Sequence, residues 1–254
     1  MVRIYDTRAG QVEEIAAGRA LRLYTCGLET ARRAHVGDLR IFLVSDLIRR
    51  ALERRRVRVV AARDAVHDED AFRADAAALN LRPAEHVPEA GEPIEELGSR
   101  IDLCVGGAVP REDVRGRWVH AEGVRFAGDA PLLSDVADAG LDPLAVRMAF
   151  LESHYRQPVE LTWDTLRAAD GRVRRWRAGV AEWSESVSAP MATAYAERAE
   201  SAFDDDLDTP AALRVLDELE GDASVAPGAK FETFLHLDSL LGLDLSSDIG
   251  KIRT

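Results

Sequence analysis

A histidine, a glycine and two cysteines are the residues whose types and spacing could support chemistry. His35 and Gly37 stand in "HVGD", directly after an apolar segment and at the start of a helical pattern. A glycine at such a turn lets a ligand approach the backbone, and the N-terminus of a helix favours phosphate. In an open parallel sheet, ligands bind beyond the carboxyl ends of the strands. The segment therefore predicts a nucleotide or phosphate pocket, although a His-x-Gly triplet alone is common.

The two cysteines, Cys26 and Cys104, do not make the framework of a disulfide-stapled domain. We expect two reduced thiols, with Cys26 acting as a small buried apolar residue rather than as a reactive group. The first residues show no apolar core with a cleavage site, and the chain has no run of about 18 apolar residues. These features predict a cytoplasmic protein without a signal peptide or a membrane span.

The charge of the chain bounds its chemistry and its partners. The 254 residues carry a formal net charge of −12. Lys230 and Lys251 are the only lysines, so every other basic residue is arginine. Any reaction that needs a lysine ammonium before residue 230 is therefore excluded. A negative chain offers little attraction for RNA, so tRNA is not expected as a partner.

Strands and helices alternate in the first half of the chain. Apolar runs predict buried strands over 21–26, 57–64, 100–107 and 117–126. Apolar residues at helical spacing predict helices over 35–56 and 67–80. The strand–helix–strand order favours parallel pairing with right-handed crossovers. We therefore predict an α/β fold with a Rossmann-like, doubly wound parallel sheet.

From about residue 141 the pattern becomes helical. Helices are predicted over 142–154, 162–183, 190–203, 209–220 and 229–242. Thr209 is expected to cap the fourth of these, with Pro210 in its first turn. The acidic run 204–206 is expected to be a solvated helix end or a helix N-cap region. We predict two domains, a truncated Rossmann-like domain over 1–140 and a helical bundle over 141–254.

Several segments, in order along the chain, resemble class I cysteinyl-tRNA synthetases and the cysteine ligase of mycothiol biosynthesis. "YTCG" with "AHVGD" resembles their "YVCG…HIGH" opening, and "DAVHDEDAF" stands where they have "NITDVDDKI". "IDLCVGG" stands where they have "DIHGGG", and "AVRMAFLESHYR" resembles "AVRLGLLAGHYR". "FDDDLDTPAALRVLDELE" resembles "ADDLDTPKAIAALD". The resemblance covers nearly the whole chain and implies the class I synthetase fold, with its HIGH-type opening, followed by a helical bundle.

The chain also departs from that family. Family members are much longer, and the chain has no counterpart of most of their connective insertion, of "GWHIEC" or of "KMSKS". The segment between residues 80 and 100 stands in place of the insertion. The resemblance therefore implies a truncated and degenerate paralogue of the synthetases.

The zinc site of the family is one of the features that change. In the family, zinc is held by the cysteine of "YVCG", a cysteine of "WHIEC" and two residues of "PHHENE", and it grips the thiolate of the substrate cysteine. Cys26 matches the first ligand, whereas Arg111 and Arg115 occupy the positions of the last two. Zinc needs four N, S or O donors, and a guanidinium repels a cation. We therefore do not expect zinc.

The groups that stabilise the transferring phosphates in the family are mostly replaced. Asp38 stands for the second histidine of "HIGH" and places a negative charge toward a negative ligand. The lysines of "KMSKS" have no counterpart. Each loss of a preorganised charge-stabilising group typically costs about 10²–10³ in rate. Little synthetase activity is therefore expected, and ATP is a candidate ligand rather than an assured one.

The residues that remain outline two adjoining pockets and a clamp. The resemblance implies a pocket for adenosine or phosphate formed by His35, Gly37, Asp38, Gly106 and Gly107. It implies a pocket for an amino acid formed by Cys26, Glu29 and Cys104. Arg111 and Arg115, together with Arg117, are candidates for a phosphate clamp in place of the lost lysines. The glycines also suit close packing of helix on sheet, whether or not a ligand binds.

Three interpretations of function stay open. The favoured one is a pseudoenzyme that charges no tRNA and binds a small molecule, an amino acid or a nucleotide, or acts through a partner. The second is a zinc-independent, ATP-dependent ligase or transferase for an amino acid in specialised metabolism. The third, a tRNA-charging enzyme, fits the sequence least. A missing insertion would expose a sheet face or edge, so a homodimer or a protein partner is a further expectation.

Overall fold

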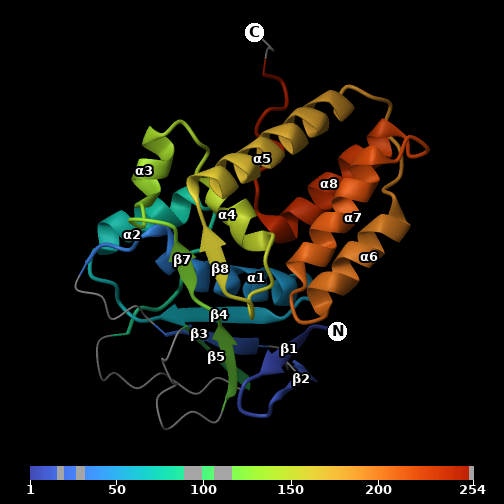
Figure 1. Ribbon diagram of the computed structural model, residues 1–254. Helices are drawn as coiled ribbons and strands as arrows, with labels where there is room; N and C mark the ends of the chain where they lie inside the picture. Colours follow the sequence, from blue (N-terminus) through green and yellow to red (C-terminus); the bar gives the residue numbers. More distant parts are fainter. Residues whose placement is uncertain (16–19, 27–31, 89–98, 106–115, 252–254) are drawn as a thin grey trace.

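A parallel sheet of four strands forms the first half of the part of the chain that the structure describes (Figure 1). The computed structural model describes residues 1–254 except 16–19, 27–31, 89–98, 106–115 and 252–254. The strands are β3 (Ala20–Thr25), β4 (Arg58–Arg63), β5 (Ser99–Val105) and β6 (Arg117–Ala121), in the order β4-β3-β5-β6. Every neighbouring pair is parallel, which confirms the predicted α/β class.

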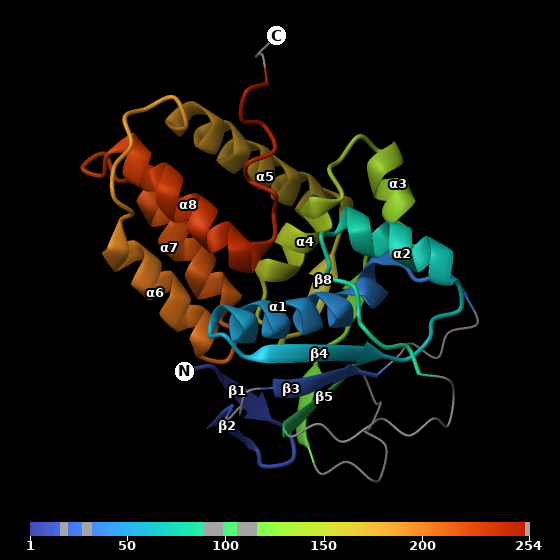
Figure 2. The same ribbon diagram turned by 180° about the vertical axis from the view of Figure 1, so that it is seen from behind.

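Helix α1 covers one face of this sheet (Figure 2). The chain reaches it through a short 3-10 helix, η1 (Val36–Leu39), which continues into α1 (Arg40–Arg54). The Thr25 hydroxyl donates to Ser45 Oγ of α1 at 2.8 Å, so Leu21, Leu23 and Thr25 of β3 face the helix. Because side chains alternate along a strand, Arg22 and Tyr24 face the other side. On β3, the face toward α1 is therefore mainly apolar, and the opposite face carries the polar Arg22 and Tyr24.

The second half consists mainly of helices, which confirms the predicted sheet-then-helices order. After α2 (Glu69–Ala78) and the short α3 (Leu133–Asp138), the chain forms α4 (Leu144–Leu151), α5 (Trp163–Trp183), α6 (Thr193–Asp204), α7 (Thr209–Gly221) and α8 (Pro227–Leu241). Helix α8 packs against α5, α6 and α1. One apolar core includes residues of the sheet, of α1 and of α4 to α8. The domain boundary between residues 140 and 141 stays a prediction.

Two small sheets complete the described fold. Strands β1 (Arg3–Asp6) and β2 (Gln11–Glu14) form an antiparallel hairpin, which the sequence analysis does not predict. Strands β7 (Val124–Phe126) and β8 (Val159–Leu161) form a parallel pair. None of the helices in the described ranges is long and apolar enough to cross a membrane.

The single strand predicted over 117–126 is wrong, because it divides into β6 and β7 at Glu122 and Gly123. The buried Arg40 guanidinium at the start of α1 donates to the carbonyls of Glu122 and Gln157, both at 2.8 Å. It also donates to the carbonyl of His154 at 2.9 Å. Burial lowers the pKa of Arg40 to about 10, an effect that the nearby Glu122 partly opposes. Arg40 thus binds backbone carbonyls of two separate segments, and the chain leaves the main sheet at the first of them, after β6.

The predicted cap of α7 is also wrong by one residue. Asp208, not Thr209, is the capping residue, since its carboxylate accepts from the amide of Ala211 at 2.9 Å. The Thr209 hydroxyl instead donates to the carbonyl of Leu151 at 2.8 Å and is buried. Both residue types cap helices, so the sequence alone could not separate them.

Asp206 in the acidic run is buried rather than solvated, contrary to prediction. Its carboxylate accepts from the amide of Tyr5 at 2.8 Å and from the Tyr155 hydroxyl at 2.6 Å. Its backbone amide donates to the carbonyl of Arg3 at 3.0 Å. Asp206 therefore joins the N-terminal hairpin to the segment between α6 and α7.

We expect Asp206→Ala to lower the free energy of unfolding by about 2–3 kcal/mol, because two buried donors lose their acceptor. The adjacent Asp205→Ala is the matched control. Asp205 makes an exposed ion pair with Arg3, and removing such a pair costs about 0–1 kcal/mol. Urea unfolding followed by circular dichroism measures both. Equal effects of the two substitutions would show that Asp206 has no special role.

Candidate functional site

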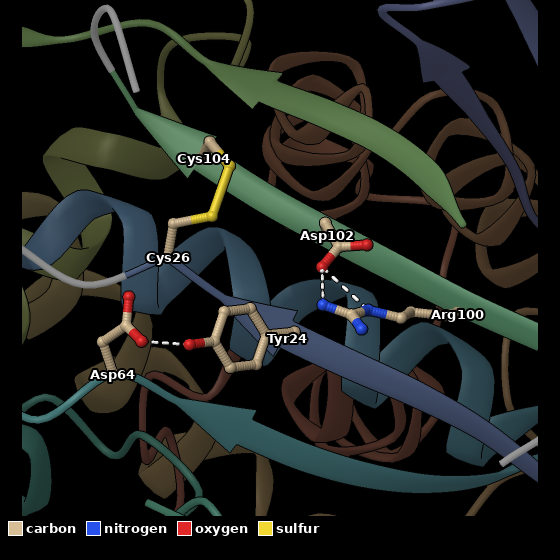
Figure 3. Close-up of a disulfide and its surroundings, with 6 residues drawn as sticks. All are labelled: Tyr24, Cys26, Asp64, Arg100, Asp102 and Cys104. Atoms are coloured by element: carbon tan, nitrogen blue, oxygen red, sulfur yellow. Dashed lines mark hydrogen bonds and ion pairs between the residues drawn. A yellow bond between two sulfur atoms is a disulfide. The ribbon is translucent and has the colours of Figure 1, made fainter. Parts of the chain in front are cut away.

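The two cysteines meet at the carboxyl ends of the central strands (Figure 3). Cys26 directly follows β3, Cys104 belongs to β5, and a disulfide joins them, with Cα atoms 5.0 Å apart. The prediction of two reduced thiols is therefore wrong. Register explains the pairing, because Thr25 lies opposite Leu103 and the next residues of the two strands then face each other. The Cys26 amide donates to the carbonyl of Leu103 at 2.8 Å and extends this register.

A polar cluster lies beside the disulfide on the same face of the sheet (Figure 3). The Tyr24 hydroxyl donates to the carboxylate of Asp64, which follows β4. Arg100 Nε donates to the carboxylate of Asp102 at 2.9 Å, and the Arg100 guanidinium lies 5.4 Å from the centre of the Tyr24 ring. Tyr24, Asp64, Arg100 and Asp102 are not among the predicted site residues. The signal for this cluster was present in "RLYTC" and "RIDLC", where polar residues alternate with the apolar ones.

Asp102 is the most constrained member of the cluster. It is 1% exposed, and its second carboxylate oxygen is buried with no hydrogen-bond partner among the described groups. Burial raises the pKa of the Asp102 carboxyl, and the hydrogen bond and charge of Arg100 only partly oppose this. Buried polar groups normally have partners, and exceptions are frequent at functional sites. Asp102 is therefore a candidate to bind a donor group of a ligand.

His35 and Asp38 form the turn that begins η1. The Asp38 carboxylate accepts from the His35 amide at 2.9 Å and from Arg32 Nη1 at 2.7 Å. The His35 imidazole is partly exposed and lies 3.6 Å from the same carboxylate. The carboxylate predicted to face an anionic ligand therefore caps a helix and pairs with a cation. That the two residues also contact adenosine or phosphate stays a prediction.

Gly37 allows η1 to approach β7 closely, in agreement with the packing role predicted for it. A Cβ atom at this position would lie 3.2 Å from the Cβ of Val124. Glu29, Gly106, Gly107, Arg111 and Arg115 lie outside the described residues. The structure thus brings Cys26 and Cys104 together, and it places His35, Gly37 and Asp38 in one turn.

A cavity of about 400 Å³ lies between α1, α2 and the carboxyl end of β4. Phe42 and Phe72 line it with ring centres 4.6 Å apart, and the hydroxyls of Thr25 and Ser45 contribute polar lining. The Arg63 guanidinium lies 4.5 Å from the centre of the Phe72 ring and is bonded to Glu69. No described residue of the predicted pockets lines this cavity. Its volume and its mixed lining of apolar and charged side chains suit a compact organic molecule with polar groups.

Zinc does not fit the described residues of the predicted metal position. A metal is bound by the thiolate form of cysteine, and the Cys26 sulfur is instead bonded to Cys104. In the described part of the chain, no group of three or more His, Cys, Asp or Glu side chains could hold a metal ion. Arg111 and Arg115, at the positions of two further ligands, lie outside that part.

Comparison with known proteins finds curated relatives among the cysteine ligases. A mycothiol-type ligase from Thermobifida fusca, named L-cysteine:1D-myo-inositol 2-amino-2-deoxy-alpha-D-glucopyranoside ligase, is 35% identical over 165 residues, covering 60% of this chain and 38% of the relative. A cysteine–tRNA ligase from Novosphingobium aromaticivorans is 31% identical over 172 residues, covering 62% and 35%. The chain is a distant relative of these cysteine ligases. The resemblance predicted from the motifs is thereby confirmed.

The match covers only part of each relative, so the activity of the whole relatives cannot be assigned to this chain from the match. The chain spans less than half the length of these two relatives. No family model matches it. Among solved structures, a Campylobacter jejuni chain provisionally described as an arginyl tRNA synthetase is 11% identical and gives a TM-score of 0.48, covering 91% of this chain and 92% of that one.

Proposed function

We propose that this relative of the cysteine ligases binds a small ligand and neither holds zinc nor charges tRNA. The observation that carries the proposal is the bond between Cys26 and Cys104. The resemblance makes Cys26 the position of a zinc ligand and Cys104 the position of a histidine at the active site. Here one covalent bond occupies both positions. A cytoplasmic setting is part of the proposal.

The charges around η1 support the same proposal. The Asp38 carboxylate binds the amide of His35, so that N–H group is not available to a phosphate. No lysine precedes Lys230 in the sequence. A triphosphate needs several preorganised positive groups for transfer, and one histidine beside a carboxylate offers little of this. ATP could then bind without being used for adenylation.

The cavity between α1 and α2 is the proposed place for an apolar part of the ligand. It is lined by small residues at Ala61, Ala62 and Ala76 and by the two phenylalanine rings. An amino-acid side chain or a nucleobase is compatible with such a volume. The hydroxyl of Ser45 could then donate to a polar atom of the ligand, since it already accepts from Thr25.

A second candidate is a zinc-independent ligase that uses ATP to activate an amino acid. It is favoured by the names of the relatives, which are ligases at 31–35% identity. Arg111 and Arg115 would serve as the phosphate clamp in that case. The two candidates differ in one measurable step, the reversible formation of an aminoacyl adenylate.

Exchange of pyrophosphate into ATP, measured with each amino acid, separates the two. We expect no exchange above a no-enzyme blank, with or without reductant, because the remaining zinc ligands and the lysine loop have no counterpart. The Thermobifida fusca ligase assayed with cysteine is the positive control. Exchange with any amino acid would overturn the first candidate and support the second. Stoichiometric zinc in the purified reduced protein would contradict the zinc claim.

A further inference from the structure

The two sulfur atoms of the disulfide differ in their access to solvent. Cys104 is fully buried within β5, whereas Cys26 is partly exposed at the end of β3. Attack by a thiol from solution is therefore expected at Cys26 rather than at the buried Cys104. We propose that this disulfide captures a small aminothiol as a mixed disulfide on Cys26, with Cys104 as the resolving thiol. The proposal rests on the proposed function only for the cytoplasmic setting.

Thiol–disulfide exchange accounts for every atom and electron in this step. The incoming thiol loses its proton, and its thiolate attacks the Cys26 sulfur. The bond between Cys26 and Cys104 breaks as the new sulfur–sulfur bond forms. Cys104 leaves as a thiolate and takes up a proton. One disulfide is exchanged for another, so no external oxidant or reductant is needed.

The backbone around the disulfide keeps the step reversible. Residues of β3 and β5 pair in parallel register up to Thr25 and Leu103, and the Cys26 amide donates to the Leu103 carbonyl. These bonds hold the two Cα atoms 5.0 Å apart without depending on the sulfur atoms. After capture, the Cys104 thiol therefore stays within reach of the mixed disulfide. It can attack the Cys26 sulfur and release the bound thiol.

The polar cluster indicates which thiol suits the site. Asp64 and Asp102 lie on the same face as the disulfide, on either side of Tyr24 (Figure 3). Asp102 is 1% exposed, and one of its oxygens has no hydrogen-bond partner among the described groups. An ammonium supplies both charge and donors to such an oxygen, whereas a second carboxylate would be repelled. The burial of Cys104 and the partial burial of Cys26 favour a small molecule.

The setting adds a physical reason for exchange. Disulfides in a reducing compartment are usually transient, catalytic or redox-sensing, because cellular thiols reduce the purely structural ones. If the chain is cytoplasmic, as proposed, its disulfide is continuously exposed to small thiols. Exchange is then the expected chemistry at Cys26.

Mass spectrometry of the full chain tests the proposal with cysteamine as the probe. The protein is incubated with cysteamine, quenched with acid, and mapped by peptide analysis. We expect an adduct on Cys26, an unmodified Cys104 thiol, and about tenfold less adduct with 3-mercaptopropionate. The carboxylate of that thiol is repelled where the ammonium of cysteamine is attracted, and tenfold corresponds to a difference of about 1.4 kcal/mol. Glutathione, a larger thiol, should also react less. An adduct on Cys104, or equal reaction with all three thiols, would overturn the proposal.

Cys104→Ala separates capture from release. Treated with cystamine, the disulfide of cysteamine, this variant should acquire the adduct on Cys26 and keep it after the reagent is removed. The wild-type protein, first reduced and freed of reductant and then treated in the same way, should lose the adduct as the Cys104 thiolate attacks the Cys26 sulfur, releases cysteamine and restores the original bond. Cys26→Ala is the matched control and should acquire no adduct, since its remaining thiol is buried. Equal retention by wild type and Cys104→Ala would exclude Cys104 as the resolving thiol.

These readouts are independent of the pyrophosphate exchange that tests the proposed function. Capture together with adenylation would contradict the proposed function and support the aminothiol site. No capture and no adenylation would sink the aminothiol site alone. Alkylation of both cysteines in the untreated, non-reduced protein would show that the disulfide is absent, and with it the basis of the capture.

Discussion

Asp46→Ala is expected to lower the free energy of unfolding by about 3–5 kcal/mol, the typical result of removing one partner of a buried ion pair. The side chains of Asp46 and Arg147 are 1% and 0% exposed, and Arg147 Nη2 lies 2.6 Å from the Asp46 carboxylate. Arg50 Nε donates to the same carboxylate at 2.7 Å. Without Asp46, two guanidinium groups are left buried without their counter-charge.

The position of Arg147 explains why the effect should be global. From α4 it donates to the carbonyl of Leu79 after α2 at 2.9 Å and to the carbonyl of Leu241 in α8 at 2.5 Å. Gly242 makes room for it, because a Cβ there would lie 2.7 Å from Arg147 Nη2. The pair of Asp46 and Arg147 thus joins α1, α2, α4 and α8 at one buried point. Losing it weakens the contact between the sheet-side elements and the helices.

Urea unfolding at several pH values measures how the stability difference between wild type and Asp46→Ala depends on pH. Burial alone would raise the pKa of the Asp46 carboxyl, but the charges of Arg147 and Arg50 outweigh it and hold the pKa below its ordinary value. A carboxyl whose folded pKa is depressed stabilises the fold above the unfolded pKa of about 3.9 and loses that effect as the pH falls through the folded pKa. The difference between wild type and Asp46→Ala should therefore be constant near neutral pH and shrink only below about pH 4.

Glu160→Ala is the matched control for this substitution. Its partner Arg125 lies 3.6 Å away, and both side chains are about four-fifths exposed. An exposed pair of this kind contributes about 0–1 kcal/mol. If Asp46→Ala were no more destabilising than Glu160→Ala, the buried ion pair would not stabilise the contact between α1, α2, α4 and α8.

Local pattern was enough to predict the elements that carry most of the fold. The helix predicted over 162–183 is α5, Trp163–Trp183, and the strand predicted over 21–26 is β3, Ala20–Thr25. Both are set by the spacing of apolar residues within a short window, which sequence shows directly. The β1–β2 hairpin was missed because its strands have four residues each and alternate charged with apolar positions.

The candidate site could be predicted only in part, because its decisive contacts join residues far apart in the chain. His35 and Gly37 were found because a strand-to-helix turn is local. The disulfide joins residues 78 positions apart and depends on β5 pairing with β3. Nothing in the sequence fixes that neighbour or its register. Arg40 is similar, since it divides β6 from β7 through carbonyls that follow it by more than 80 residues.

Reduction of the Cys26–Cys104 disulfide is expected to lower the melting temperature by roughly 10 °C. The bond closes a loop over a sequence separation of 78 residues. Closing a loop of that length in the unfolded chain removes conformational entropy worth about 4 kcal/mol at room temperature. A chain of this size loses about 2–4 °C in melting temperature for each kcal/mol. Calorimetry with and without a phosphine reductant measures the shift.

The double substitution Cys26→Ala with Cys104→Ala makes this prediction specific to the disulfide. That variant should melt at one temperature with or without reductant, near that of the reduced wild type, because both lack the same cross-link. A thiol assay under denaturing conditions establishes that no free thiol is present before reduction. A wild-type protein free of thiols that nevertheless melted unchanged after reduction would show that the register of β3 and β5, rather than the covalent bond, holds this edge of the sheet. The carboxyl ends of the two strands would then keep their arrangement in both redox states, and reduction would change the chemistry of the site without changing its frame.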